Sequence, residues 1–357
     1  MNELSSKASF SVGSATDVGV VRTENQDCIG YFEASDNRWT LLVVCDGMGG
    51  HAGGQRASAL CTDVVSKEFA SRIAHMEPGV ALGQAIRAAN SAVFSMAMAE
   101  PELRGMGTTC AALAATDTNV YIAHVGDSRI YRVRPGSVEL LTRDHSAVQR
   151  MVDGGILTPE QASVHPESNV LIRCVGGEAD VEPESRGPEV ILSGDRFVLC
   201  SDGLWSLVQG HEIAGMASAF TAQDAVERLI RLAKSRGGPD NISVQIYHRD
   251  DGHPPTNTYS PEKFMTKAGA TVGNLSIDTE DSCKPRHRAK RRWLNSAVGG
   301  GVALVLSLAA AVWWWSQDGT STALIPDNNA DKAKTSHDAA DAEFDREEPA
   351  LKVEKIN

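Results

Sequence analysis

The sequence has few aromatic residues, no excess of basic residues and no paired cysteines. Aromatic residues make up 5% of its 357 positions, although apolar residues at 42% suffice for a large core. The 34 Lys and Arg are outnumbered by 46 Asp and Glu, which gives a formal net charge of −12. A nucleic-acid-binding protein normally presents a basic face, so we expect no nucleic-acid partner. The D-x-[DN]-x-[DN]-G pattern does not occur, which excludes an EF-hand calcium loop.

The seven cysteines are scattered along the chain and form no C-x-x-C pair. Cys45 and Cys200 lie inside apolar runs, where we expect them to be small core residues rather than metal ligands. This usage indicates a reducing compartment. The first residues, MNELSSKASFSVGSATD, also lack the basic and then apolar pattern of a secretory signal. We therefore expect residues 1–250 to be in the cytosol.

Four aspartates next to apolar runs are the most informative residues present. Three of them follow strand-like runs: Asp46 in LLVVCDGMGG, Asp127 in VYIAHVGDSR and Asp202 in FVLCSDGLW. Asp240, in GGPDNISVQI, precedes such a run. An acid beside a glycine or asparagine turn at a strand end points its carboxylate out of the sheet edge. The repetition of this pattern predicts that the four carboxylates gather at one site.

Gathered carboxylates repel one another and must therefore bind protons or cations. Two like charges about 4 Å apart repel by roughly 4 kcal/mol at an effective dielectric constant near 20. Because these ligands are all oxygens, Mg²⁺ and Mn²⁺ are the expected ions. Two such ions that share a carboxylate activate a water and assist in-line displacement at phosphorus. The pattern therefore indicates metal-assisted hydrolysis of a phosphoester.

Eight short segments occur in the order found in one known protein family. They are RTENQD (22–27), DGMGGH (46–51), GMGTT (105–109), GDSR (126–129), TRDHS (142–146), NVLIRCVGG (169–177), SDGLW (201–205) and GGPDNIS (237–243). In these segments the chain resembles the bacterial type-2C (metal-dependent, PPM-type) serine/threonine protein phosphatases over residues 10–248. The resemblance implies two Mn²⁺ or Mg²⁺ ions and a weaker third.

The resemblance also implies metal-binding roles for five residues. Asp46 would bridge the first two ions, and Gly47 would offer its backbone carbonyl to one of them. Asp202 and Asp240 would hold the other ion. Asp127 matches the acid that helps to hold the third ion in bacterial members.

Three further residues match catalytic positions of the family. Arg22 matches the arginine that binds the substrate phosphate, a role suited to the planar guanidinium group. Asp27 would act through metal-bound waters. His51 corresponds to a proposed general acid, since the pKa of an imidazole lies near neutrality; a surface histidine at a helix start is the alternative. Gln26 stands where eukaryotic members often have glutamate and is not counted as a ligand.

The segment GMGGHA (47–52) also fits the G-x-G-x-x-A fingerprint of a dinucleotide-binding loop. That interpretation would place Asp46 close to the pyrophosphate. It also requires a second strand that ends in an acid about 20 residues further on, whereas residues 54–73 read as one helix. Nucleotide binding is therefore the weaker interpretation.

Strand-like and helical runs alternate over residues 40–247. The predicted strands are Thr40–Cys45, Cys110–Ala115, Val120–Ala123, Ile130–Val133, Arg196–Cys200 and Ile242–Tyr247. The predicted helices are Gln55–Ile73, Val80–Ala99, Ala147–Val152 and Ala222–Lys234. Periodicity alone indicates a mixed α and β domain.

The resemblance implies an α+β fold over residues 1–249, with two antiparallel sheets packed face to face and helices on both outer sides (a four-layer αββα sandwich). It also implies a flap beside the active site within residues 144–177.

The composition changes after residue 249. Residues 250–283 are rich in Gly, Pro, Thr, Asn and Ser and read as a flexible linker. Residues 284–293 form a basic juxtamembrane segment, and residues 295–315 are predicted to form a transmembrane helix. The uncharged part, Ala297–Trp315, would span about 28 Å, close to the roughly 30 Å of a bilayer core. The acidic residues 316–357 are predicted to be a disordered tail.

These segments predict a single-pass protein of the cytoplasmic (inner) membrane. The basic residues would keep the catalytic domain in the cytosol, so the tail would lie outside. Three consecutive tryptophans at the far end of the apolar run are typical of an interfacial aromatic belt. A cleavable signal is excluded by position, and a buried core helix fits the basic and polar flanks poorly.

The expected function is hydrolysis of phosphoserine and phosphothreonine in phosphoprotein substrates by in-line attack of a metal-bridged hydroxide. By family analogy, the expected partner is a Hanks-type serine/threonine kinase. One alternative is a binding module that recognises phosphoproteins without hydrolysing them, but every expected carboxylate is present. Another is a membrane-anchored sensor, but the tail has too little apolar content for a ligand-binding domain.

Overall fold

A computed structural model describes residues 9–34, 38–50, 53–250, 252–253 and 352–353. Contacts divide the chain into two units, Met1–Ala270 with Glu347–Asn357 and Thr271–Arg346, and the second unit lies outside the described residues. The predicted basic segment and transmembrane helix (284–315) also lie outside them, as does nearly all of the linker and the tail. Within the described residues, no helix combines the length and apolar character needed to cross a membrane.

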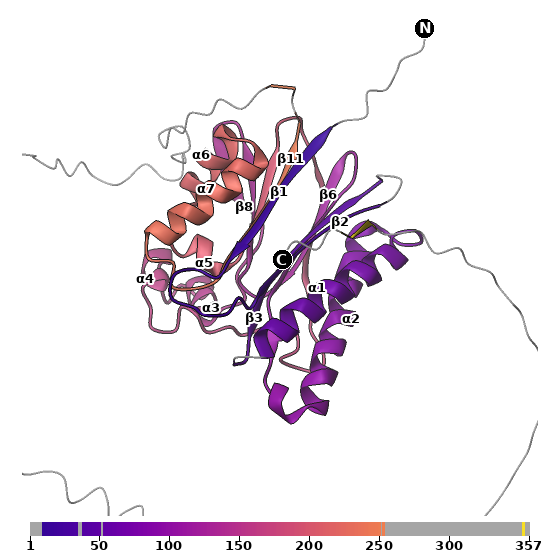
Figure 1. Ribbon diagram of the computed structural model, residues 1–357, viewed down its shortest axis with the longest axis vertical. Coiled ribbons are helices and arrows are strands. Elements are labelled where there is room, and N and C mark those ends of the chain that lie inside the picture. Colours follow the sequence, from indigo (N-terminus) through magenta and orange to yellow (C-terminus); the bar gives the residue numbers. More distant parts are fainter. Residues whose placement is uncertain (1–8, 35–37, 51–52, 251, 254–351, 354–357) are drawn as a thin grey trace, which may run out of the picture. The chain divides into compact units, whose positions relative to one another are not determined.

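Two antiparallel sheets form the centre of the described part (Figure 1). The five-stranded sheet has the order β1-β11-β10-β7-β8, formed by Phe10–Asp17, Ile242–Arg249, Arg196–Cys200, Arg129–Arg134 and Ser137–Leu140. The seven-stranded sheet has the order β12-β2-β3-β5-β6-β9, formed by Lys352–Val353, Asp27–Glu33, Thr40–Met48, Cys110–Ala115, Asn119–Val125 and Glu184–Val190. Its remaining strand, β4 (Gly107–Thr108), pairs with the end of β3.

Successive side chains of the central strands point alternately into two separate apolar cores. In β3, Leu42 and Val44 belong to the core between the sheets, together with Phe197 of β10. Leu41 and Val43 belong to the core on the opposite face of the same sheet. All five are fully buried. Because successive side chains of a strand point to opposite faces, a run that is apolar throughout requires cover on both sides.

Helices supply that cover on both outer sides (Figure 1). α1 (Gly53–Arg72) and α2 (Pro78–Ala99) bury their apolar faces against the seven-stranded sheet. α6 (Gly210–Ala219) and α7 (Ala222–Ser235) do so against the five-stranded sheet. The shorter elements are η1 (Pro101–Leu103), α3 (Ala147–Asp153), α4 (Pro159–Ser163) and α5 (Asp202–Trp205). The predicted arrangement of two antiparallel sheets with outer helices is confirmed.

The predicted strands β5 and β10 have the observed bounds, and β3 runs three residues further than predicted, through Asp46 and Gly47 to Met48. The strands β1, β2, β8 and β9 and the helix α6 were not predicted from the sequence. The sequence of β9, ESRGPEV, has no apolar alternation, and five of its seven residues are exposed. It lies at the sheet edge, where hydrogen bonding to β6 defines the strand instead of burial.

The two-residue strand β12 pairs with β2, with Lys352 opposite Glu33 and Val353 opposite Phe32. It therefore extends the seven-stranded sheet beyond β2. These two residues belong to the segment predicted as an outer tail (316–357). The placement of residues 316–357 as an outer tail stays a prediction.

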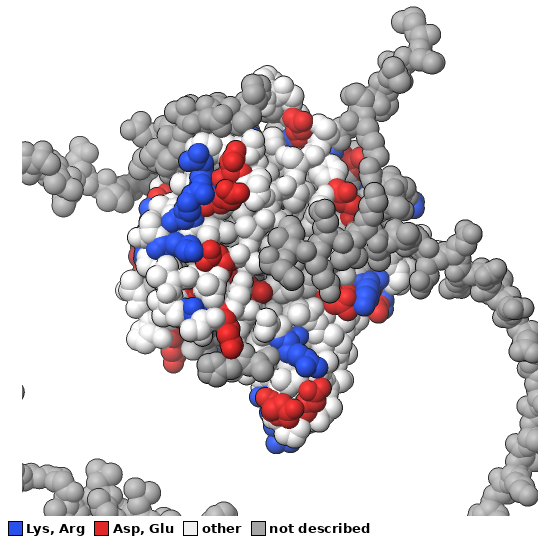
Figure 2. Space-filling view, viewed as in Figure 1, with Lys and Arg blue, Asp and Glu red and all other residues white. Residues whose placement is uncertain are grey.

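Acidic and basic side chains are intermixed on the face shown in Figure 2. Several pairs on the helices are close ion pairs, including Lys67 with Asp63 on α1 and Arg236 with Glu212 at α7 and α6, at 2.9 and 2.7 Å. Such exposed pairs each contribute at most about 1 kcal/mol to folding stability. The expectation that the chain binds no nucleic acid stays a prediction.

Candidate active site

The predicted site residues converge on one cavity of about 590 Å³. Its lining includes six of them: Arg22, Asp46, Gly47, Asp127, Asp202 and Asp240. The acids come from the end of β3, the turn after β6, the start of α5 after β10 and the turn before β11. Because β10 and β11 are antiparallel neighbours, the end of one strand lies beside the start of the other. The strand order therefore brings together carboxylates that are far apart in sequence.

Asp46 is held through its backbone. Its N–H donates to the hydroxyl of Thr109 at 2.9 Å, and its carbonyl accepts from the N–H of Thr109 at 2.8 Å and from the hydroxyl of Thr108 at 2.9 Å. The Thr109 hydroxyl also lies 2.7 Å from that of Ser128. These bonds fix the backbone on both sides of the carboxylate. Thr108 and Thr109 belong to the GMGTT segment, but neither residue was predicted to belong to the site.

Gly47 lies where β3 passes very close to the start of α1. A Cβ atom at this position would be 2.1 Å from the carbonyl oxygen of Gly54 and 2.6 Å from that of Gln26. Both atoms are backbone, so neither could move aside without displacing its element. Glycine is therefore the residue that allows this approach.

Asp240 and Asp202 lie on the side of the cavity formed by the five-stranded sheet. Asp240 accepts from the N–H of Asn241 at 2.8 Å through Oδ1 and from Arg22 Nη2 at 2.9 Å through Oδ2. The Arg22 side chain is 52% exposed, so its guanidinium lies at the mouth of the cavity. Asp202 is the first residue of α5, and its buried Oδ1 has no hydrogen-bond partner.

Asn241 holds the loop between β1 and β2 at three points. Its side-chain Oδ1 accepts from the N–H of Gln26 at 2.8 Å, and its Nδ2 donates to the carbonyls of Val18 and Glu24 at 3.0 and 2.9 Å. It thereby positions the loop that carries Arg22. Asn241 was not predicted as a site residue, although it directly follows Asp240 in the GGPDNIS segment.

Asp127 follows β6 and the left-handed Gly126, whose φ is 101°. The carbonyl of Asp127 accepts from Trp205 Nε1 at 3.0 Å, and the N–H of Gly126 donates to Nδ1 of His145 at 3.1 Å. The guanidinium of Arg129 lies 3.6 Å from the centroid of the Trp205 ring. Arg129 also donates to both carboxylate oxygens of Asp144, at 3.0 and 2.7 Å. These contacts fix the turn and were not predicted.

Asp27 faces Asp46 across the pairing of β2 and β3. Its Oδ2 accepts from the hydroxyl of Ser201 at 2.8 Å, whereas its buried Oδ1 has no hydrogen-bond partner. Asp27 thus lies behind Asp46 and is not part of the cavity lining. His51 lies outside the described residues, so its predicted role stays a prediction.

Burial and mutual repulsion raise the pKa values of the clustered carboxyls. Burial raises the pKa of Asp27 to about 7 and that of Asp127 to about 8, with a further contribution from the negative charge of Asp202. Burial, followed by repulsion from Asp27, Asp202 and Asp127, raises the pKa of Asp46 well above its usual range. Burial and the neighbouring Asp240 likewise raise the pKa of Asp202. Without cations, Asp27 and Asp127 therefore keep their protons up to about pH 7 and pH 8, and the same effects favour the protonated forms of Asp46 and Asp202.

The residues present fit divalent cations. The donor atoms are carboxylate and carbonyl oxygens, which Mg²⁺ and Mn²⁺ prefer. The buried Oδ1 atoms of Asp27 and Asp202 have no hydrogen-bond partner, and a bound ion or its waters would satisfy them. Cations would also cancel the repulsion that raises the carboxyl pKa values. The site is therefore suited to hold divalent ions.

We expect the thermal stability of the chelator-treated protein to fall as pH rises. The unfolded chain releases the protons of Asp27 and Asp127 near pH 4, whereas the folded protein keeps them until about pH 7 and 8. Over this window the folded state binds more protons, so the free energy of unfolding decreases with increasing pH. Mn²⁺ should replace these protons, so the difference in Tm with and without Mn²⁺ should widen from pH 5 to pH 8. Calorimetry checks this, and a Tm gap independent of pH would contradict it.

A cluster of buried carboxylates beside an exposed arginine, at one end of two face-to-face antiparallel sheets, is the arrangement expected of a metal-dependent phosphoester hydrolase. The comparisons with known proteins agree. The family model described as protein phosphatase 2C matches residues 20–236. The chain therefore belongs to the protein phosphatase 2C family of metal-dependent serine/threonine protein phosphatases, as the resemblance implied.

Similar proteins are bacterial phosphatases. The chain is 38% identical over 238 residues to the serine/threonine protein phosphatase PstP of Mycobacterium tuberculosis, and 36% identical over 234 residues to the protein phosphatase PhpP of Streptococcus pneumoniae. Each match covers 65% of this chain; it covers 43% of the mycobacterial protein and 94% of the pneumococcal one. This chain thus spans less than half the length of the mycobacterial relative.

Solved structures with the same fold include the phosphatase PstP/Ppp of M. tuberculosis. It has a TM-score of 0.61 and 35% sequence identity, and the match covers 68% of this chain and 99% of that one. The catalytic domain of PstP in complex with two manganese ions gives a TM-score of 0.59 at 34% identity, over 68% of this chain and 99% of that one. Both solved structures share the fold of this chain, and the second contains two manganese ions.

Proposed function

We propose that this chain hydrolyses phosphoserine and phosphothreonine in proteins with the help of Mn²⁺ or Mg²⁺. The observation that carries the proposal is the shared cavity, in which Asp46, Asp127 and Asp202, whose pKa values are raised by burial and mutual repulsion, lie with Asp240 and Arg22. Membership of the protein phosphatase 2C family supports the reaction, and the two manganese ions in the PstP structure support the ion number.

The predicted site residues that line the cavity each have a role in this proposal. Asp46, the carbonyl of Gly47, Asp202 and Asp240 would hold two ions, and Asp127 would contribute to a weaker third. When bound, the ions supply Lewis acidity and an activated water for in-line displacement at phosphorus.

The remaining residues bind and orient the substrate and manage protons. Arg22 lies at the cavity mouth and presents a fork of donors to the phosphate in place of its present contact with Asp240. Asp27, fixed by Ser201, offers its unpartnered Oδ1 to an ordered water behind Asp46. His51 would protonate the departing serine or threonine oxygen. Because the leaving group is a side-chain oxygen, the substrate must present that side chain from an accessible segment.

The test is phosphate release from a phosphothreonine peptide by the full chain, measured with Mn²⁺, with Mg²⁺ and with excess chelator. We expect turnover only with an ion present and its loss in Asp202→Ala. Glu212→Ala, on α6 away from the cavity, is a matched control that should keep its activity. A folded, metal-binding protein that binds the phosphopeptide without hydrolysing it would contradict the proposal and favour a phosphoprotein-binding module.

We further propose that residues 284–315 tether the enzyme to the cytoplasmic membrane, with the catalytic domain in the cytosol. There it would counteract a Hanks-type kinase. The support is the basic run KPRHRAKR followed by the uncharged Ala297–Trp315. Tethering would raise the local concentration of enzyme at a membrane-bound substrate. Deletion of 284–315 should move the protein from the membrane fraction to the soluble one and slow dephosphorylation of the kinase in cells. Equal fractionation of both forms would contradict the tether, and equal dephosphorylation would contradict its benefit.

A further inference from the structure

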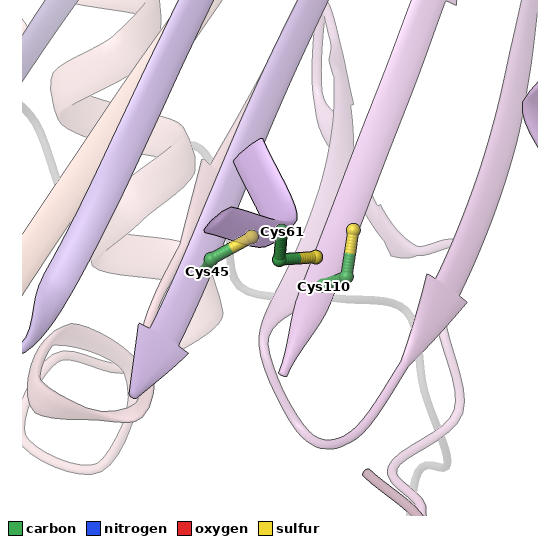
Figure 3. Close-up of side chains that lie close together, drawn as sticks. All are labelled: Cys45, Cys61 and Cys110. Atoms are coloured by element: carbon green, nitrogen blue, oxygen red, sulfur yellow. The ribbon is translucent and has the colours of Figure 1, made fainter. Parts of the chain in front are cut away.

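Three buried cysteines lie together behind the active site, and the proposed reaction uses none of them. Cys45 is on β3, Cys110 is on the neighbouring strand β5, and Cys61 is on α1 (Figure 3). All three are fully buried, and their sulfur atoms lie within 4.8 Å of one another. They are far apart in sequence, so the tertiary fold alone assembles the group.

The sheet register explains how the cluster is held. Val44 pairs with Ala111, so the following position brings Cys45 opposite Cys110. Both point to the face that α1 covers, like the other odd-numbered core residues of β3, Leu41 and Val43. Cys61 points from α1 toward this pair (Figure 3). Strand pairing and helix contact thus fix three thiols without any ligand.

We propose that Cys45, Cys61 and Cys110 form a binding site for a soft monovalent cation, Cu(I). Sulfur donors select soft ions, of which Cu(I) and zinc are the common cases in proteins. A trigonal site with metal–sulfur bonds of about 2.3 Å places its three sulfurs about 4.0 Å apart, within the separation observed here. Small rotations of the side chains suffice to close the site.

Zinc fits the cluster less well because structural zinc sites have four protein ligands. Among the described residues, the group of close ligand atoms has three members, and full burial leaves no place for a solvent ligand. The hydroxyl of Thr62, next to Cys61, already donates to the carbonyl of Ser58 at 2.9 Å. Three sulfurs and no fourth ligand match the low coordination number of Cu(I).

The binding reaction is balanced without an oxidant or reductant. The ion enters as Cu(I) and stays Cu(I), and each thiol that binds as a thiolate releases one proton to solvent. Because the sulfurs are buried, entry requires local opening of α1 from the sheet, and loading should therefore be slow.

The position of the cluster couples it to the active site. Cys45 directly precedes Asp46, and Cys110 directly follows Thr109, which holds the backbone of Asp46 through two hydrogen bonds. Drawing Cys45 and Cys110 together would shift β3 where it carries Asp46 and β5 where it follows Thr109. We therefore expect a filled cluster to lower phosphatase activity. This consequence rests on the proposed function, whereas ion binding does not.

The test is competition for Cu(I) between the anaerobic, reduced full-length protein and a Cu(I)-chelating dye. The wild type should withdraw one equivalent, and Cys61→Ala should bind at least about 100-fold more weakly, since even indirect partners of a metal site change affinity 10–100-fold. Cys200→Ala removes a buried cysteine of the other sheet, and Cys28→Ala removes the neighbour of Cys45 on β2; both should keep the ion. Circular dichroism checks that each variant is folded.

Undiminished binding by Cys61→Ala, or none by the wild type, would overturn the site whether or not the protein is a phosphatase. In the second arm, Cu(I)-loaded wild type should release phosphate at least about tenfold more slowly with Mn²⁺ than metal-free protein given Mn²⁺, whereas Cys61→Ala should respond to Cu(I) little. Equal rates for loaded and unloaded wild type would overturn the coupling to Asp46.

Discussion

Asp46→Asn is expected to lower kcat for phosphopeptide hydrolysis by at least about 10³-fold, because electrostatic and metal contributions of this kind are usually the largest in catalysis. The substitution keeps the shape of the side chain and removes one negative charge. It also removes a carboxyl whose raised pKa lowers the free energy of unfolding at any pH above its unfolded value, so the metal-free protein should become more stable at pH 8. The variant should therefore combine lost activity with a higher Tm in chelator and a smaller response to Mn²⁺.

The matched control for this prediction is Asp63→Asn on α1. Asp63 forms an exposed ion pair with Lys67 at 2.9 Å, and its loss should change stability by less than about 0.5 kcal/mol. Stopped assays of phosphate release and calorimetry with and without Mn²⁺ give both readouts. Substantial turnover by Asp46→Asn, or a lower Tm in chelator, would contradict the assignment of Asp46 to a shared metal position.

The acids of the site could be predicted from sequence because each carries a local signal. Asp46, Asp127, Asp202 and Asp240 each lie next to an apolar strand and a small turn residue, and the structure brings all four to one cavity. The expected burial of Cys45 and Cys200 is also confirmed, since both are fully buried.

The residues that hold the site could not be predicted in the same way. Thr109, Asn241 and His145 act through hydrogen bonds to residues that lie 19 or more positions away in sequence. A threonine, an asparagine or a histidine in a turn has many local uses, so its type and position do not reveal its partner. Only the strand order places Asn241 beside the loop that carries Arg22.

The same limit applies to the fold and to the thiol cluster. Apolar runs predict central strands such as β5 and β10, whereas the edge strand β9 is defined by pairing and has no such run. For the cysteines, sequence indicates burial but not which other thiol lies nearby. Cys45 and Cys110 meet because β3 and β5 are neighbours, a consequence of topology rather than of local pattern.

Gly47→Ala is expected to reduce kcat/KM by at least about 100-fold although it removes no side-chain ligand, because misplacement by about 1 Å can cost that much in catalysis. The new methyl group would meet the carbonyl of Gly54 at 2.1 Å, so the end of β3 and the start of α1 must separate. That shift moves both the Gly47 carbonyl and the Asp46 carboxylate, so the affinity for Mn²⁺ should fall as well.

The matched control is Gly83→Ala, the same substitution in α2. Its Cβ would lie 3.5 Å from the hydroxyl of Ser185, an ordinary contact. In a helix interior, alanine is more stable than glycine by about 1 kcal/mol. This variant should keep its activity and gain stability. Titration of phosphate release with Mn²⁺ distinguishes the cases, because a displaced ligand set raises the Mn²⁺ concentration needed for half-maximal activity. If Gly47→Ala has wild-type Mn²⁺ dependence and rate, the backbone at Gly47 is not a constraint on the metal site, and its proposed carbonyl ligand loses its support.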